Sequence, residues 1–328
     1  MHVTGDRIGD ALLKYPALRA FRAACPRTRI TWVTGLRPSV FAGRLAPLAE
    51  GLIDEVHAAT SLGQRLFAPL PAFLAPHYDI VLASEAKLRT TLVLRRIACR
   101  RFISPTWNFF FSHVRPAADF AGATGYQRFT LLLSLAAGVT LVPRPAIDAP
   151  PELATMAAAL LPAGSCYVGL CPGAGGARKR WPPERFIELA RRQATRGRIP
   201  VFFLGPEEAD LRTQLATAVP QARFVEEEAA ARGAGGVLAS IALASRLALG
   251  VSNDSGGGHL LAAGGRPMLK LYGHTSAHKF RSPYGPQRAL EAAAFGGESI
   301  TDIPVDAVDD AVESILSRDA VRSPSTSI

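Results

Sequence analysis

Short apolar segments rich in β-branched residues alternate with longer amphipathic segments along most of the chain. The short segments are typical of buried strands, and the longer ones repeat apolar residues at the spacing of a helix. This alternation predicts parallel α/β units, in which helices pack against a sheet. In the first half, strands are expected at 3–5, 29–35, 52–59, 78–84 and 100–105, and helices at 8–25, 38–50, 86–98 and 120–138.

A proline cluster, VPRPAIDAPPEL at 142–153, interrupts the alternation and indicates a linker between domains. The pattern then restarts, which predicts two Rossmann-like doubly wound domains, residues 1–145 and 146–328, facing each other across a cleft. Ligands are expected at the carboxyl ends of the strands. In the second half, strands are expected at 167–173, 199–205, 247–254 and 267–275, and helices at 182–197, 207–218, 236–246 and 305–318.

The composition is that of a soluble globular protein, with 48% hydrophobic and 20% charged residues in a chain of 328. The most apolar segment, 130–142, is shorter than the roughly 20 residues of a spanning helix. The start, MHVTGDRIGD, lacks the apolar core of a secretory signal. We therefore expect a cytoplasmic protein whose four cysteines are reduced.

Positive charge is concentrated in the first half. The chain carries a net charge of +10, and residues 1–150 hold 18 Lys and Arg against 9 Asp and Glu. Six cations lie in KLRTTLVLRRIACRR (87–101), which is either a solvated helix face or a surface that attracts phosphates. These cations lack the aromatic interleaving or helix-turn-helix pattern of a nucleic-acid binder, so that class is disfavoured.

Three glycine-containing turns fall where strands should end and helices begin. A helix N-terminus offers unpaired N–H groups and the positive end of the helix dipole, which together bind phosphate. In the first turn, GDRIGDALL, Asp6 and Asp10 lie at the start of the following helix. They either cap that helix, or Asp10 acts as a general base.

The second turn, CPGAGGARKRWPPERF (171–186), combines three glycines with three consecutive cations. It lacks the endings of a P-loop and of a dinucleotide fingerprint, so it is either a pyrophosphate-binding loop or a plain surface loop. In the third, VSNDSGGGHLLAAGG (251–265), Asp254 or Ser255 could cap a helix, and the glycines allow a ligand to approach the backbone. The alternative is a tight turn with one packed histidine.

Taken together, these motifs resemble a known family, the ADP-heptose:lipopolysaccharide heptosyltransferases of glycosyltransferase family 9. The resemblance rests on GDRIGDALLKYPALRAF, YDIVLASEAKLRT, CPGAGGARKRWPPERF, FFLGPEEAD, VSNDSGGGHLLAAGGRPMLKLYGHT and SPYG, in this order. It implies a GT-B fold with the nucleotide sugar in the second domain and the acceptor in the first. It also implies an inverting, metal-independent transfer of heptose from ADP-heptose to an inner-core sugar. The last helix, about 305–317, would cross back to the first domain.

The resemblance also implies roles for individual residues. Asp10 would be the catalytic base, and Lys179 would stabilise negative charge on the departing diphosphate. Glu207 would contact the ribose of the donor. Acceptor contacts would come from Lys87, Arg89 and His274. The other donor-binding residues would be Gly173, Arg178, Arg180, Asp254, Ser255, Gly256, Gly257 and His259.

The resemblance also implies partners, and some questions stay open. We expect a monomer that needs no cofactor, binds an anionic lipopolysaccharide-type acceptor and meets the inner membrane surface. The aromatic segment TWNFFFSH (106–113) either rests against lipid or is buried core. Only MHVT precedes Gly5, so the first strand is clipped or the natural start lies upstream. Gly273-His274-Thr275 and SEAKL depart from the family pattern, which leaves the acceptor open.

Two other functions remain as alternatives. One is a different GT-B transferase or epimerase acting on a nucleotide sugar, and the other is a catalytically silent nucleotide-sugar-binding protein.

Overall fold

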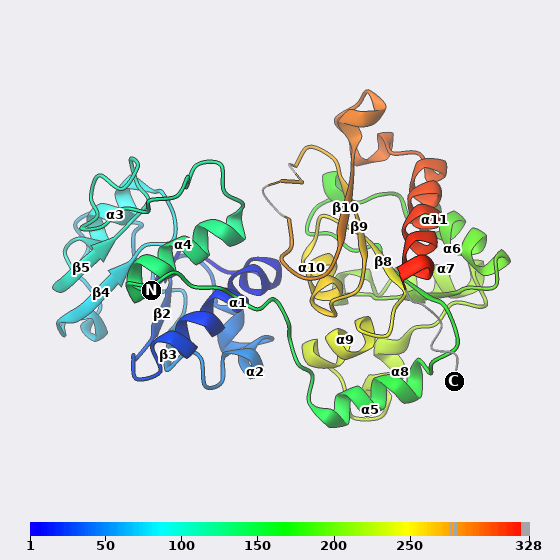
Figure 1. The fold of residues 1–328 in the computed structure, drawn as a ribbon, viewed down its shortest axis with the longest axis horizontal. Helices are drawn as coiled ribbons and strands as arrows, with labels where there is room; N and C mark the ends of the chain where they lie inside the picture. The colour runs from blue at the N-terminus through cyan, green and yellow to red at the C-terminus, as the bar shows by residue number, and fades with distance from the viewer. Residues whose placement is uncertain (276, 279–280, 323–328) are drawn as a thin grey trace. The chain divides into compact units, whose positions relative to one another are not determined.

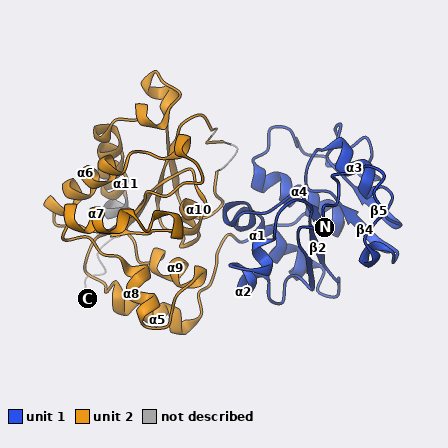
Figure 2. Ribbon diagram, turned by 180° about the vertical axis from the view of Figure 1, so that it is seen from behind, with its two compact units in different colours: residues 1–144 blue, residues 145–328 orange. Residues whose placement is uncertain are grey.

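The computed structural model describes residues 1–275, 277–278 and 281–322. The chain divides into two compact units, residues 1–144 and 145–328 (Figure 2). The predicted domain boundary lies one residue from this division. Each unit contains parallel strands covered by helices. None of the helices within the described residues is long and apolar enough to span a membrane.

The first unit contains five short parallel strands. β2 pairs with β1 on one side and β3 on the other, and β4 pairs with β5. A bridge between His2 and Ala83 joins the two groups, which gives the order β3-β2-β1-β4-β5. This order changes direction between β1 and β4, the point where doubly wound sheets bind ligands. The strands are β1 (His2–Val3), β2 (Thr31–Thr34), β3 (Glu55–His57), β4 (Tyr78–Leu82) and β5 (Cys99–Ile103).

Helices α1 and α4 pack against each other in the first unit. A capping box of Thr124 and Gln127 begins α4, and Gly138 ends it in the left-handed conformation (φ 73°). The predicted helix at 38–50 is wrong, because Gly43 (φ −144°, ψ −114°) separates a 3-10 turn from the four-residue α2. The helices are α1 (Ile8–Ala24), α2 (Ala46–Ala49), α3 (Leu88–Leu94) and α4 (Gly125–Ala137).

The second unit has a five-stranded parallel sheet in the order β10-β9-β8-β6-β7. Every residue of β6, β8 and β9 is buried, as expected for strands with helices on both faces. The strand order changes direction between β6 and β8, so the carboxyl ends of these two strands are where a ligand is expected. The strands are β6 (Tyr167–Cys171), β7 (Ile199–Phe202), β8 (Leu249–Asn253), β9 (Met268–Tyr272) and β10 (Gln287–Glu291).

Two groups of helices cover this sheet (Figure 1). α6 contacts α7 and α11, whereas α9 contacts α5, α8 and α10. α5 begins at Pro151, inside the segment predicted as a linker, so that prediction is wrong for its second part. The helices are α5 (Pro151–Leu160), α6 (Pro183–Thr195), α7 (Leu211–Ala218), α8 (Val225–Ala231), α9 (Val237–Ala244), α10 (Gly256–Ala263) and α11 (Val305–Arg322).

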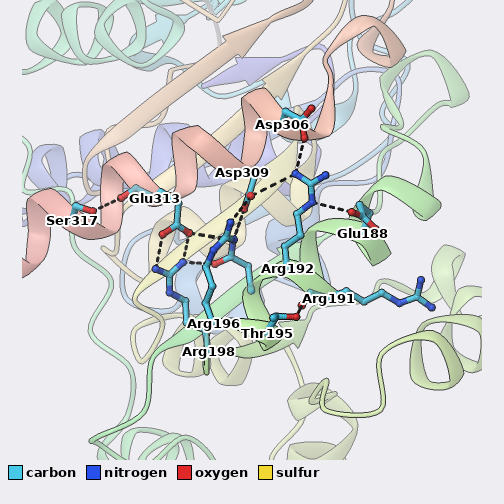
Figure 3. Close-up of polar contacts among 11 residues, drawn as sticks. Glu188, Arg191, Arg192, Thr195, Arg196, Arg198, Asp306, Asp309, Glu313 and Ser317 are labelled. Atoms are coloured by element: carbon cyan, nitrogen blue, oxygen red, sulfur yellow. Dashed lines mark hydrogen bonds and ion pairs between the residues drawn. The ribbon is translucent and has the colours of Figure 1, made fainter.

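The last helix, α11, is held by ion pairs to the C-terminal end of α6 and the residues that follow it (Figure 3). Arg196 holds Asp309 through two hydrogen bonds of 2.8 Å, and Arg198 Nη2 lies 2.8 Å from Glu313 Oε2. Val308 and Val312 of the same helix join the core formed by α6 and the sheet. α11 thus completes the second unit, and its predicted return to the first unit stays a prediction.

Candidate functional site

Two loops meet at the carboxyl ends of β6 and β8. Asn253, the last residue of β8, is fully buried and fixes both ends of the loop that follows β6. Its Nδ2 donates to Pro172 O (2.7 Å), and its Oδ1 accepts from Trp181 N (3.1 Å). Because a buried amide with satisfied hydrogen bonds is costly to displace, the loop 172–181 is held against the start of α10.

The two loops contribute an ion pair between Lys179, predicted as a catalytic residue, and Asp254, predicted as a donor-binding residue. Lys179 ends a 3-10 turn, and its Nζ lies 2.7 Å from Asp254 Oδ2. The side chain of Asp254 is 5% exposed and that of Lys179 is 32% exposed. Thr275 Oγ1 donates to the same carboxylate oxygen at 2.9 Å. The structure therefore brings Lys179 and Asp254 together, and adds Thr275, which the sequence reasoning did not select.

The N-terminus of α10 lies directly after Asp254. Ser255 caps the helix, since its hydroxyl accepts from Gly258 N at 3.2 Å, and Gly256 is the first helical residue. A Cβ on Gly257 would lie 2.6 Å from Cys171 Sγ, and one on Gly258 would lie 2.3 Å from Ser252 Oγ. Both glycines are therefore required for α10 to lie close to the sheet. The first turn presents N–H groups suited to a phosphate.

His259 lies in the second turn of α10 and is only 5% exposed. Its Nδ1 is 3.2 Å from Nζ of Lys270, a buried residue of β9. Burial, together with the positive charges of Lys270 and Lys179, keeps the pKa of His259 well below its ordinary value of 6.5. The sequence reasoning selected His259 and missed Lys270, although a lysine within the apolar segment MLKLY is a visible signal.

Two adjacent glutamates stand in different environments beside the loop after β6. Glu207, the predicted ribose contact, is 75% exposed, and Glu208 is 9% exposed. Arg180 Nη2 lies 3.6 Å from Glu207 and 3.7 Å from Glu208, and burial raises the pKa of Glu208. A Cβ on Gly173 would lie 2.6 Å from the carboxyl carbon of Glu208. The predicted Gly173 thus makes room for Glu208, while Arg178 is exposed.

In the first unit, the two aspartates of the first turn differ sharply. Asp6 is buried and accepts hydrogen bonds from Trp32 Nε1 (3.0 Å), Ser39 Oγ (2.9 Å) and Val40 N (3.2 Å). These bonds give Asp6 a structural role. Asp10 is the third residue of α1 and is partly exposed. Of the two, Asp10 is the carboxylate that a substrate could reach.

The predicted acceptor residues lie on different elements. At the carboxyl ends of β1 and β4, Lys87 Nζ lies 2.6 Å from Glu85 Oε2 and 2.9 Å from Thr4 Oγ1. Burial alone would raise the pKa of Glu85, but hydrogen bonds from Lys87 and Thr4 lower it below its ordinary value. Arg89 is exposed on α3, and His274 is exposed after β9 in the second unit. Lys87 and Arg89 thus belong to the first unit and His274 to the second.

A cavity of about 350 Å³ opens beside the loop that follows β3 in the first unit. Thr60 N donates to Thr34 O at the end of β2, which places this loop at the carboxyl edge of the sheet. The lining includes hydroxyl and amide groups and one cation, Arg65. Within residues 1–275, 277–278 and 281–322, no three His, Cys, Asp or Glu side chains are grouped as metal ligands.

Comparison with solved structures shows the fold that the chain shares. A glycosyltransferase family 9 structure from Veillonella parvula superposes with a TM-score of 0.68 at 19% identity, covering 97% of this chain and 96% of that one. The E. coli heptosyltransferase WaaC with ADP gives 0.65 at 19% identity, covering 96% and 98%. The predicted GT-B fold is confirmed by these likenesses.

The family follows from the sequence. The model of glycosyltransferase family 9 (heptosyltransferase) matches residues 71–294, and the chain belongs to this family, as predicted. Lipopolysaccharide heptosyltransferase 2 of Salmonella typhimurium is 31% identical over 171 residues, which are 47% of this chain and 48% of that protein. Lipooligosaccharide heptosyltransferase 2 of Haemophilus influenzae is 32% identical over 110 residues, 33% of this chain. The matched segments span about half and about a third of these relatives (48% and 32%).

Proposed function

We propose that the protein is an inverting glycosyltransferase that moves heptose from ADP-heptose to an inner-core sugar of lipopolysaccharide. The observation that carries the proposal is the Lys179–Asp254 pair, 2.7 Å long, beside the glycine-rich N-terminus of α10. A cation and a helix N-terminus at the switch point of a parallel sheet form a site for a diphosphate. Two of the related structures are of WaaC with ADP and with ADP-2-deoxy-2-fluoro heptose.

On the donor side, the bond between the anomeric carbon and the diphosphate oxygen breaks, and negative charge develops on the leaving ADP. Lys179 and the first-turn N–H groups of α10 would stabilise that charge. These groups supply the stabilisation that a divalent cation gives in other transferases. We therefore propose a metal-independent reaction without a cofactor.

On the acceptor side, we propose that Asp10 removes the proton of the attacking hydroxyl. The new glycosidic bond forms on the face of the anomeric carbon opposite the departing diphosphate, and this inverts the configuration. Asp10 is a partly exposed carboxylate in the first turn of α1, where its oxygens can accept a hydrogen bond from the acceptor hydroxyl and then its proton. The proton passes from Asp10 to solvent after transfer.

The acceptor is proposed to be anionic. The cavity beside the loop after β3 contains Arg65, and the first half of the chain carries the excess of Lys and Arg. Phosphate or carboxylate groups on an inner-core sugar would be attracted to this unit. Lys87 and Arg89 remain candidate contacts from the same unit, and His274 from the second.

An aromatic loop in the first unit, with two exposed rings, supports contact with the inner membrane. Trp107, Asn108 and Phe109 are consecutive left-handed residues, with φ between 49° and 65°. Phe109 is buried against Phe120, whereas Trp107 and Phe110 are 63% and 65% exposed. The segment TWNFFFSH is thus part core and part exposed surface. Exposed aromatic residues favour the interface of a bilayer.

We also propose that the protein acts as a monomer at the cytoplasmic face of this membrane. Sedimentation with anionic phospholipid vesicles tests the loop: Trp107→Ser with Phe110→Ser should reduce binding. Leu36→Ser removes another exposed apolar side chain, 55% exposed, and serves as the control. Equal binding by both variants would remove the loop from the membrane contact.

The donor is tested by thermal shift with ADP, UDP and GDP, followed by mass spectrometry of reactions with ADP-heptose and a heptose-free core acceptor. We expect stabilisation by ADP species and a product one heptose heavier. Preference for UDP would indicate a different transferase. Turnover of the donor without an acceptor would indicate an epimerase, and binding without turnover would indicate a silent binding protein.

A further inference from the structure

Three polar side chains form a row across the central strands beneath α10. Cys171 of β6 is the register partner of Ser252 of β8, which in turn is the partner of Lys270 of β9. In-register residues of parallel strands point to the same face of a sheet. All three are buried, and Lys270 is 1% exposed. Burial of an ammonium group is costly, so its surroundings must compensate for it.

The compensation comes from α10. The helix lies close to the sheet because Gly257 and Gly258 lack a Cβ, and this brings His259 Nδ1 to 3.2 Å from Lys270 Nζ. A protonated lysine can only donate a hydrogen bond, so Nδ1 of the neutral His259 must accept it. The imidazole hydrogen therefore resides on Nε2. No hydrogen bond from Nε2 to another described residue is present, which leaves this N–H for a ligand.

Two charged side chains, Asp254 and Lys179, lie near Lys270 and His259. Asp254, after β8, carries a negative charge, and Lys179 of the loop after β6 is paired with it. Burial lowers the pKa of Lys270 to about 8, against the opposing effects of Asp254 and Cys171. Burial also raises the pKa of Cys171 to about 12, so it is a neutral thiol. At pH 7 the group therefore consists of two cations, one carboxylate and a neutral histidine.

We propose that Lys270 is a positioning residue for the diphosphate of the donor: it fixes His259 as the Nε2–H tautomer and adds buried positive charge beneath the N-terminus of α10. The identity of the ligand rests on the proposed function, whereas the tautomer of His259 follows from its contact with Lys270 and from the positive charge of that lysine. Lys270 acts through His259 and through its charge, and it is not assigned a contact with the substrate.

The first test is nitrogen NMR of the ligand-free protein labelled in histidine. In the wild type at pH 7, His259 should show the Nε2–H pattern. Lys270→Met replaces the lysine by an apolar side chain of similar length, and the pattern should change to a mixture of tautomers. Leu269→Met, on the opposite face of β9, is the matched control and should leave it unchanged. An unchanged pattern in Lys270→Met would overturn the role of Lys270. Lys270→Gln serves if the Met variant does not fold.

The second test is calorimetric titration with ADP at pH 7 and pH 9.5. Loss of the buried charge should weaken binding at pH 7 on the order of tenfold in Lys270→Met. Wild-type affinity should fall as the pH rises above about 8, the pKa of Lys270, and this fall should be absent from the variant. Equal affinities and equal pH profiles would overturn the proposal. If the wild type itself does not bind ADP, the proposed donor is wrong, while the NMR result on His259 still stands.

Discussion

Lys179 Nζ lies 2.7 Å from Asp254 Oδ2, with the carboxylate almost completely buried and the ammonium group a third exposed. This difference in exposure leaves the cation accessible to an anionic ligand. Thr275 Oγ1 also donates to Asp254, so the carboxylate would keep this partner if an anionic ligand competed for Lys179. Under the proposed function, the pair would serve two states, an internal ion pair without ligand and a diphosphate contact with it.

Lys179→Ala should lower kcat with ADP-heptose by roughly 10²–10³, the effect of removing one charge-stabilising donor from a transferase site. It should also weaken ADP binding, because ground state and transition state share the diphosphate. Steady-state kinetics and ADP titration measure the two effects. Arg232→Ala removes an exposed cation of the same unit and is the control. Unchanged kinetics in Lys179→Ala would exclude this residue from the site.

Asp10→Asn should reduce transfer by about 10²–10⁴, the usual contribution of a general base, while ADP binding remains. Asp6→Asn is a useful contrast, since Asp6 is bonded to Trp32, Ser39 and Val40. It should lower the free energy of unfolding by about 1–3 kcal/mol and have little effect on kcat of the folded fraction. The reverse outcome, activity loss only at Asp6, would transfer the base role to that residue.

Gly258→Ala should displace α10 from the sheet, because the new Cβ would lie 2.3 Å from Ser252 Oγ and 2.9 Å from Asn253 O. Overpacking of this kind costs about 1–3 kcal/mol of unfolding free energy, and ADP affinity should fall with it. Gly176→Ala is the matched control, because no atom lies within 4 Å of its Cβ position. Thermal melting with and without ADP would detect both changes. Identical behaviour of the two variants would contradict the close packing of α10.

Stability of the second unit should depend on pH through the ion pairs between α6 and α11. Burial alone would raise the pKa of Asp309, but the hydrogen bonds and charges of Arg196 and Arg192 lower it below its ordinary value. A hydrogen bond from Arg198 likewise lowers the pKa of Glu313. A lowered carboxyl pKa contributes stability above the unfolded value, which is lost as the pH falls through the folded value. Unfolding free energy should therefore decrease below about pH 4. Asp309→Asn should flatten this decrease in denaturant titrations at pH 7, 5 and 3.

Transfer should continue in EDTA, since Lys179 and α10 are proposed to stabilise the leaving group without a metal ion. The measurement compares initial rates before and after chelation, and then after addition of Mg²⁺ or Mn²⁺. A loss of activity in EDTA that a divalent cation restores would replace this part of the proposal with metal-assisted departure of ADP.

Much of the architecture could be predicted from the sequence. The parallel α/β pattern and the strands around β2, β4, β6, β8 and β9 follow from buried apolar runs, which depend little on distant contacts. The motif turns were predicted at the ends of strands, and the structure places them there. Of the donor motifs, the loops containing Lys179 and Asp254 do meet, at the point where the strand order changes direction.

The elements that were missed depend on tertiary context. The segment of β10, QRALE, has no β-branched residue and becomes a strand because it pairs with β9 along five residues. α5 was hidden by the prolines before it, although proline in the first turn is compatible with a helix start. Lys270 and Glu208 were missed because burial of a charged group is decided by the elements that fold over it. Neither depends on a local motif.

The packing of α11 against the rest of the second unit has a consequence for folding during synthesis. Val308, Ala311 and Val312 of α11 belong to the same buried cluster as Val168 and Leu170 of β6. Most of the sequence of the second unit lies between this strand and this helix. Translation delivers β6 first, and its apolar face lacks this cover until α11 emerges from the ribosome. Because domains generally fold as units, the first unit can close early in translation, whereas the second unit must wait for α11.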